Sequence, residues 1–117
     1  MREKPRDPAR LHHILMSIDN IRRFLSDKKL DDFSENSMLY FAVVKNLEII
    51  GEAAYMLTTN FKEEHSETPW HNIVGMRHYL VHGYYQASLD EIWQAATVDI
   101  IPLREQVKKY LAEFCDM

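Results

Sequence analysis

The sequence contains little cysteine, glycine and proline, and it has no long apolar run. A single cysteine, Cys115, excludes an internal disulfide and a zinc ribbon, so a reducing cytoplasm is the expected compartment. The 3 glycines and 4 prolines are too few for a sandwich or barrel of many short strands. No apolar run approaches the roughly 20 residues that span a bilayer, and the first ten residues lack the apolar core of a signal peptide. We therefore expect a cytoplasmic, all-α protein that has no membrane partner.

An excess of positive charge is also missing. The formal net charge is -4, with 14 lysines and arginines against 18 aspartates and glutamates. This balance excludes a broad basic surface that binds nucleic acid through many phosphate contacts. Any function directed at RNA must therefore come from a local site. Hydrophobic residues at 46% and charged residues at 27% fit one globular domain over residues 1–117, with residues 1–8 as a flexible lead-in.

Apolar residues recur at helical spacing in four stretches of the chain. The expected helices cover about residues 8–25, 35–57, 70–82 and 89–114, and the polar stretch 58–68 has room for one short helical turn. The second helix has the most continuous apolar pattern and should be the most buried. Four helices with short connections predict an antiparallel four-helix bundle.

Glycine and proline positions refine this prediction. Asp7 and Pro8 resemble a helix start, with Asp7 as the N-cap and Pro8 as the first helical residue. Gly51, inside the second helix, costs about 1 kcal/mol relative to alanine and so indicates a close approach of another helix. Gly83 should close the third helix. Pro102 should kink the last one, because its ring nitrogen cannot donate to the carbonyl of Val98.

The run from Arg77 to Tyr84, Arg-His-Tyr-Leu-Val-His-Gly-Tyr, concentrates groups that carry chemistry. A helical residue turns by about 100°, so His78 and His82 share a face while Arg77 and His82 point about 140° apart. Arg77 and His82 could meet on one ligand only if the helix ends near His82, an ending that Gly83 supplies. A planar cation that grips phosphate, together with a titratable imidazole, is the smallest set of groups for RNA cleavage without a metal.

The spacing alone leaves two other interpretations open. An arginine and a histidine five residues apart often form only a solvated face or a satisfied polar network. His78 and His82, four apart, could instead ligate a metal. The residues between them lack the adjacent glutamate of a zinc-protease helix, however, and no third ligand is obvious.

Three ordered blocks of sequence add a family resemblance. These blocks are residues 46–53 (Asn-Leu-Glu-Ile-Ile-Gly-Glu-Ala), Pro69-Trp70 followed by residues 73–77 (Ile-Val-Gly-Met-Arg), and residues 80–84 (Leu-Val-His-Gly-Tyr) with Trp93 and the final helix behind them. Their order and spacing resemble the HepT family, small HEPN-domain toxins encoded beside a minimal nucleotidyltransferase antitoxin called MntA. The similarity covers the chain from about Leu11 to Phe114.

The resemblance implies a helical homodimer in which the Arg/His motifs of two subunits face a shared cleft. Arg77 and His82 would then be the catalytic pair of a ribonuclease that uses no metal and no other cofactor. Tyr84 matches the tyrosine to which an MntA-like antitoxin transfers AMP, which would block the cleft by bulk and negative charge. Close relatives commonly have asparagine where this chain has His78, which either adds an acid or base or replaces an amide hydrogen bond.

Two glutamates and two tyrosines could support the motif. Glu48 and Glu52 share a face of an apolar helix, so we expect at least one of them to contact the motif helix and orient Arg77. Tyr79 and Tyr85 flank the motif. Aromatic residues beside a phosphate site can stack on a base, but on a bundle helix they are more often packing or dimer contacts. The pair His12-His13 has no spacing that demands chemistry.

Two functions of other classes stay open beside the RNase toxin. One is a non-catalytic subunit that binds nucleotide or substrate for a nucleotidyltransferase, with Arg77 and Tyr84 as nucleotide ligands. The other is a structural dimer that has no site. RNA cleavage in EDTA separates the toxin from both.

Overall fold

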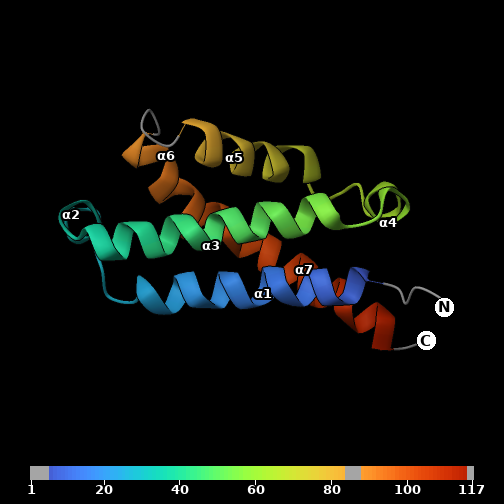
Figure 1. Ribbon diagram of the computed structural model, residues 1–117. Coiled ribbons are helices and arrows are strands. Elements are labelled where there is room, and N and C mark those ends of the chain that lie inside the picture. The colour runs from blue at the N-terminus through green and yellow to red at the C-terminus, as the bar shows by residue number, and fades with distance from the viewer. Residues whose placement is uncertain (1–5, 84–87, 116–117) are drawn as a thin grey trace.

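Helices make up the folded part of the chain. The computed structural model describes residues 6–83 and 88–115 (Figure 1), and no strand occurs in these two ranges. The elements in order are α1 (Asp7–Phe24), α2 (Leu30–Glu35), α3 (Ser37–Met56), α4 (Thr59–Glu64), α5 (Trp70–Gly83), α6 (Leu89–Gln94), a π-helical turn (Ala95–Asp99) and α7 (Ile100–Cys115). The prediction of an all-α fold is confirmed. Within the described residues, no helix is long and apolar enough to cross a membrane.

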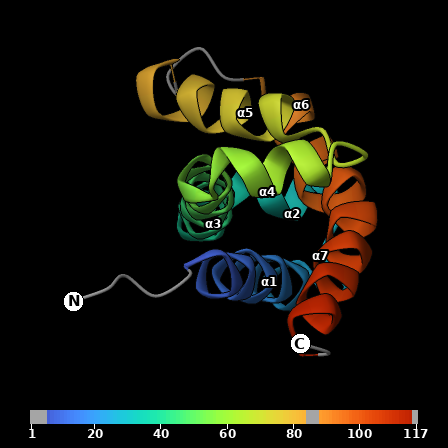
Figure 2. The same cartoon turned by 90° about the vertical axis from the view of Figure 1, so that its right-hand side faces the viewer.

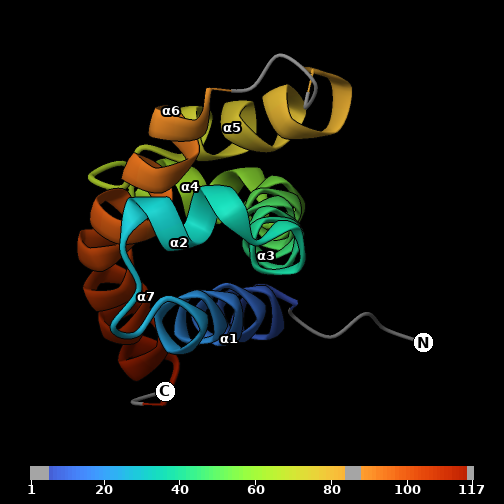
Figure 3. The same cartoon turned by 90° about the vertical axis from the view of Figure 1, so that its left-hand side faces the viewer.

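Three of the long helices lie side by side in one layer. α3 occupies the middle, with α1 packed along one flank and α5 along the other, and successive helices run in opposite directions (Figure 1). α7 packs on α1 and crosses one side of this layer, whereas no labelled helix covers the opposite side (Figures 2 and 3). The arrangement is the predicted antiparallel bundle. Its uncovered side is the face on which the candidate site lies.

The apolar stripes of the sequence form the core. α1 contributes Leu11, Ile14, Ile18 and Ile21, all fully buried, and α3 contributes Val43, Val44, Leu47, Ile50, Ala53 and Ala54. Burial of a Val, Leu or Ile side chain contributes about 1.5–3 kcal/mol, so these two helices supply a large part of the core's stability. The other face of α3 is not covered. Phe41 and Tyr55, on that face, are 56% and 60% exposed.

The start of α1 differs from the prediction. The helix begins at Asp7, and Arg6 is its N-cap, so the assignment of Asp7 as N-cap is wrong. The carboxylate of Asp7 instead accepts hydrogen bonds from the backbone N–H and the hydroxyl of Thr58, at 2.9 and 2.8 Å. Thr58, 51 residues away, takes the place of the local N–H groups that an N-cap carboxylate would bind, and local sequence spacing cannot show this contact. Asp7 thus ties the start of α1 to the start of α4.

A short helix, α2, lies between the first two expected helices, where the sequence predicted none. The carboxylate of Asp32 accepts the backbone N–H of Lys29 at 2.8 Å, which caps the first turn. Phe33, the one apolar residue at its centre, is fully buried and lies 5.4 Å from the ring of Trp93 between centroids. The buried ring of Phe33 anchors α2, and a helix of six residues is too short for its apolar residues to recur at helical spacing in the sequence.

The last helix is irregular just before Pro102. Residues Ala95–Asp99 form a π-helical turn, in which the backbone N–H of Ile100 reaches the carbonyl of Ala95. Because Pro102 has no N–H, the carbonyl of Val98 loses its α-helical donor, and the N–H of Ile100 also approaches it. The predicted disturbance is therefore present, and it takes the form of one wider turn upstream of the proline.

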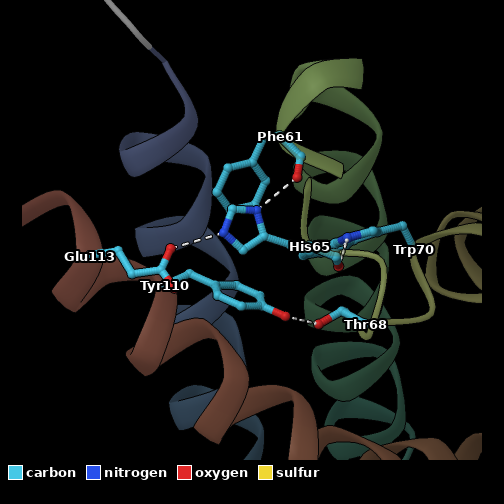
Figure 4. Close-up of polar contacts among 6 residues, drawn as sticks. All are labelled: Phe61, His65, Thr68, Trp70, Tyr110 and Glu113. Atoms are coloured by element: carbon cyan, nitrogen blue, oxygen red, sulfur yellow. Dashed lines mark hydrogen bonds and ion pairs between the residues drawn. The ribbon is translucent and has the colours of Figure 1, made fainter. Parts of the chain in front are cut away.

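A cluster around His65 joins α4 and the start of α5 to α7 (Figure 4). The imidazole Nδ1 lies 2.8 Å from the carbonyl oxygen of Phe61, and Nε2 lies 2.9 Å from Oε1 of Glu113. The indole N–H of Trp70, the first residue of α5, donates to the carbonyl of His65 at 3.0 Å. The hydroxyls of Thr68 and Tyr110 are also hydrogen-bonded to each other. These contacts fix where α5 begins.

We expect the unfolding free energy to depend on pH through His65. Burial lowers the pKa of His65, but the hydrogen bonds to Glu113 and to the Phe61 carbonyl outweigh it and hold the pKa above its ordinary value. A raised folded pKa stabilises the fold below about pH 6.5, and this contribution is lost as the pH rises through the folded pKa. Glu113→Gln should therefore cost about 0.5–1 kcal/mol near pH 5.5 and much less at pH 8.5 in chemical denaturation.

Glu64→Gln is the matched control, because Glu64 is an exposed carboxylate on the neighbouring helix α4. It should leave the pH profile of stability as in the wild type. If the two substitutions lowered the unfolding free energy equally at both pH values, the His65–Glu113 contact would not depend on the protonation of His65.

Candidate active site

Arg77 lies where α5 comes closest to α3. A Cβ atom built on Gly51 of α3 would overlap the Cβ of Arg77, and it would lie 3.1 Å from both the Arg77 Cγ and the carbonyl oxygen of Ile73. The absent side chain at Gly51 is therefore the space that the stem of Arg77 occupies. The prediction that Gly51 marks a close helix approach is confirmed, and the residue on the other side of that approach is the motif arginine.

An ion pair orients the guanidinium of Arg77. Its Nε lies 2.9 Å from Oε1 of Glu52, the residue that follows Gly51 on α3. The Arg77 side chain is 33% exposed and that of Glu52 is 49% exposed, so the pair stands at the surface and leaves guanidinium donors for a ligand. The expectation that Glu48 or Glu52 contacts the motif helix is confirmed for Glu52.

Arg77 opens into a groove of about 270 Å³ that spans three helices. Its lining residues come from α1, α3 and α5, and none comes from α6 or α7: they are Arg10, His13, Lys45, Glu48, Ile49, Glu52, Ala53, Arg77 and Val81. We call this the Arg77 groove. Glu48 thus lies beside the pair of Arg77 and Glu52 as a second carboxylate of the same groove.

His82 does not line the Arg77 groove. It lies on α5, which continues to Gly83, and none of the described glycines has a positive φ. α5 ends at Gly83, as predicted, but His82 is itself helical and its ring lies beside that of His78, so this ending does not turn His82 back toward Arg77. At about 140° around the helix, the two side chains of one chain diverge. One copy of the chain brings together Arg77 and Glu52, but it does not bring Arg77 and His82 together.

His78 and His82 are neighbours on the exposed side of α5. Their ring centroids are 4.5 Å apart and the rings are inclined by 48°. Within residues 6–83 and 88–115, no further histidine, cysteine or carboxylate joins them in a group of three that could hold a metal ion. His78 thus lies beside the imidazole of the motif, in ring contact with His82.

The tyrosines of the motif fall into two groups. The hydroxyl of Tyr79 donates to Glu91 at 3.1 Å and accepts the backbone N–H of Ser88 at 3.2 Å, so Tyr79 links α5 to the start of α6. This is the packing role expected for it. Tyr84, the predicted modification site, and Tyr85 lie outside the described residues.

Sequence analysis assigned no role to three polar residues of the groove: Arg10, His13 and Lys45. Arg10 and His13 share a face of α1, and Lys45 lies in one stripe of α3 with Glu48 and Glu52. Each spacing is visible in the sequence. Only the packing of α1 and α5 on α3 shows that these faces meet beside Arg77.

Known proteins are similar to this chain over most of its length. The family described as "Ribonuclease HepT-like" matches residues 14–110. "Putative RNase TTE0752" of Caldanaerobacter subterraneus subsp. tengcongensis is 38% identical over 86% of this chain and 90% of its own length. "Probable ribonuclease HepT" of Thermococcus cleftensis is 33% identical over 85% of this chain and 90% of its own length.

A longer relative shares the same region. "Gamma-glutamylcyclotransferase and putative RNase MJ0434" of Methanocaldococcus jannaschii is 37% identical over 88% of this chain, which spans 46% of that protein. No solved structure matches the chain significantly.

Proposed function

The chain belongs to the HepT-like ribonuclease family, and from this membership we propose that it cuts RNA without a metal, with Arg77 and His82 as its catalytic residues. The observation that carries the proposal is the fixed position of Arg77. Gly51 gives its stem room and Glu52 holds its Nε, so the guanidinium stands ready at the groove before any ligand arrives. Such preorganised charge is the largest single contribution in many enzymes.

The proposed reaction needs a cation and proton transfer. The 2′-oxygen of a ribose attacks the adjacent phosphorus and loses its proton to a base, while the bond to the 5′-oxygen breaks and that oxygen gains a proton. Arg77 would neutralise the charge that develops on the phosphoryl oxygens. His82 would carry the proton, supported by the adjacent ring of His78. The products are a 2′,3′-cyclic phosphate and a 5′-hydroxyl.

A homodimer would bring the two catalytic residues together. Arg77 and His82 of one chain point apart, so a shared cleft would combine Arg77 of one copy with His82 of the other. The uncovered face of the helical layer supports this assembly (Figure 2). Phe41 and Tyr55 lie in one stripe of α3 with the groove residues and are both more than half exposed, an apolar surface that a second copy can bury.

The activity is tested by incubating the purified chain with labelled RNA in excess EDTA and analysing the product ends. We expect cleavage that leaves 2′,3′-cyclic phosphates. Absence of cleavage under all conditions, with retained nucleotide binding, would instead support the non-catalytic subunit of a nucleotidyltransferase complex.

The proposal extends to a toxin–antitoxin pair controlled at Tyr84. An MntA-like nucleotidyltransferase would transfer AMP from ATP to the Tyr84 hydroxyl and release pyrophosphate. Tyr84 is two residues from His82, so the added phosphate and adenosine would place bulk and negative charge beside the catalytic imidazole.

Co-expression with the neighbouring nucleotidyltransferase gene should add one or more AMP units to the intact mass of the chain and abolish RNA cleavage. Tyr84→Phe should remain unmodified and toxic. Tyr85→Phe is the matched control and should be modified as the wild type is. Modification of Tyr84→Phe to the same extent would move the site elsewhere.

A further inference from the structure

The Arg77 groove contains more positive charge than the ribonuclease proposal uses. Arg10 from α1 and Lys45 from α3 face the same groove as Arg77, against the carboxylates of Glu48 and Glu52. These five groups sum to a net charge of +1, three cations less two anions. The chain as a whole has a net charge of -4. The groove is thus a local positive region on an acidic protein, the kind of local site that an RNA-directed function requires here.

Arg10 has an unmet hydrogen-bond donor in this groove. Its Nε is buried, and it has no hydrogen-bond partner among the described residues. A buried donor without an acceptor costs about 1–3 kcal/mol, so native proteins seldom keep one that has no use. Glu52 forms its ion pair with Arg77 and is not an acceptor for the Nε of Arg10. An anion that binds the guanidinium of Arg10, with the side chain turned to bring its Nε to the groove, would supply the missing acceptor.

We propose that Arg10, together with Lys45, binds phosphate groups of the RNA backbone next to the phosphate held by Arg77. The inference rests on the proposed ribonuclease function. A guanidinium presents planar, forked donors that match two phosphate oxygens, and the exposed ammonium of Lys45 adds a point charge on the α3 side. Because these groups come from three helices, the RNA strand crosses the α1–α3–α5 layer on its uncovered side (Figures 2 and 3). Arg10 and Lys45 are binding residues in this account, and they take no part in proton transfer.

The test compares Arg10→Ala with Arg22→Ala, which removes the same charge from an exposed position of the same helix. The probe is a fluorescent single-stranded RNA with 2′-O-methyl groups, which block attack by the 2′-oxygen, so that wild-type protein binds without cutting. Arg10→Ala should weaken binding about ten-fold and reduce the slope of log affinity against log salt by about 0.7. Arg22→Ala should change neither. Arg10→Lys, which keeps the charge and loses the fork, should give an intermediate affinity.

Cleavage kinetics and the oligomeric state give the readouts that a structural role would not reproduce. With cleavable RNA, Arg10→Ala should raise KM while kcat changes little, and its size in light scattering should match that of the wild type. Equal RNA affinities of the Arg10 and Arg22 variants would overturn the inference, as would conversion of Arg10→Ala to monomers, which would make Arg10 a contact of the second copy. If the wild type neither binds nor cuts RNA, the ribonuclease proposal itself fails, whereas wild-type cleavage with an unchanged KM in Arg10→Ala rejects only the role of Arg10.

Discussion

Arg77→Ala and His82→Ala are each expected to lower the rate of RNA cleavage in EDTA by about 10²- to 10⁴-fold. The first removes the fixed cation of the groove, and the second removes the imidazole that carries the proton. Neither should unfold the protein. The ion pair of Arg77 with Glu52 is 33% and 49% exposed, and His82 is exposed, so each change should cost no more than about 1 kcal/mol of stability. Initial cleavage rates and thermal unfolding of the same samples measure both effects.

Mixing the two inactive variants tests whether the catalytic residues come from different copies. A dimer of one Arg77→Ala chain and one His82→Ala chain keeps one complete pair if Arg77 acts with the His82 of the other copy. Half of randomly exchanged dimers would have one intact site of two, so about a quarter of the wild-type rate should return. A mixture as inactive as its components would show that the pair works within one chain, against the divergence of the two side chains on α5.

Gly51→Ala should be among the most damaging single substitutions in the chain. The new methyl group would overlap the Cβ of Arg77, an atom next to the backbone that no rotamer change can remove, so α3 and α5 must separate. Overpacking of this kind costs about 1–3 kcal/mol and outweighs the better helix propensity of alanine. The shift also displaces Arg77 from Glu52, so cleavage should fall together with stability. Chemical denaturation and cleavage rates of the same variant provide the measurement.

Gly75→Ala is the control for Gly51→Ala, because nothing lies within 4 Å of a Cβ atom built at Gly75. This substitution on α5 should stabilise the fold by about 0.5–1 kcal/mol through helix propensity alone and leave cleavage unchanged. A Gly51→Ala protein that is as stable and active as Gly75→Ala would show that α3 and α5 do not approach as closely as described.

Helices that bury a long apolar stripe could be predicted from the sequence. The short helix α2 and the polar contact of Asp7 could not. The stripes of α1 and α3 and the disturbance before Pro102 follow from local spacing and the chemistry of proline. α2 depends on the single buried ring of Phe33, and Asp7 on a partner 51 residues away. Such long-range contacts leave no periodic signal.

The site divides in the same way. A close helix approach at Gly51 and a contact of Glu48 or Glu52 with the motif helix could each be predicted, because a glycine and a carboxylate in an apolar helix demand an explanation. The structure joins Gly51, Glu52 and Arg77 as one unit. The same local reasoning placed the end of α5 correctly at Gly83, but the turn of His82 back to Arg77 that it inferred from this ending is wrong, since His82 is still helical. Arg10 and Lys45 could not be connected to the site, because their faces meet Arg77 only through the packing of three helices.

The most direct test of this account compares the wild type with the double variant Arg77→Ala/His82→Ala on the same labelled RNA in excess EDTA. The measured quantity is the initial rate at which fragments ending in 2′,3′-cyclic phosphate appear. The account predicts rapid formation of these fragments by the wild type and none above background by the folded double variant. Equal rates for the two proteins would contradict the assignment of Arg77 and His82 as the catalytic residues.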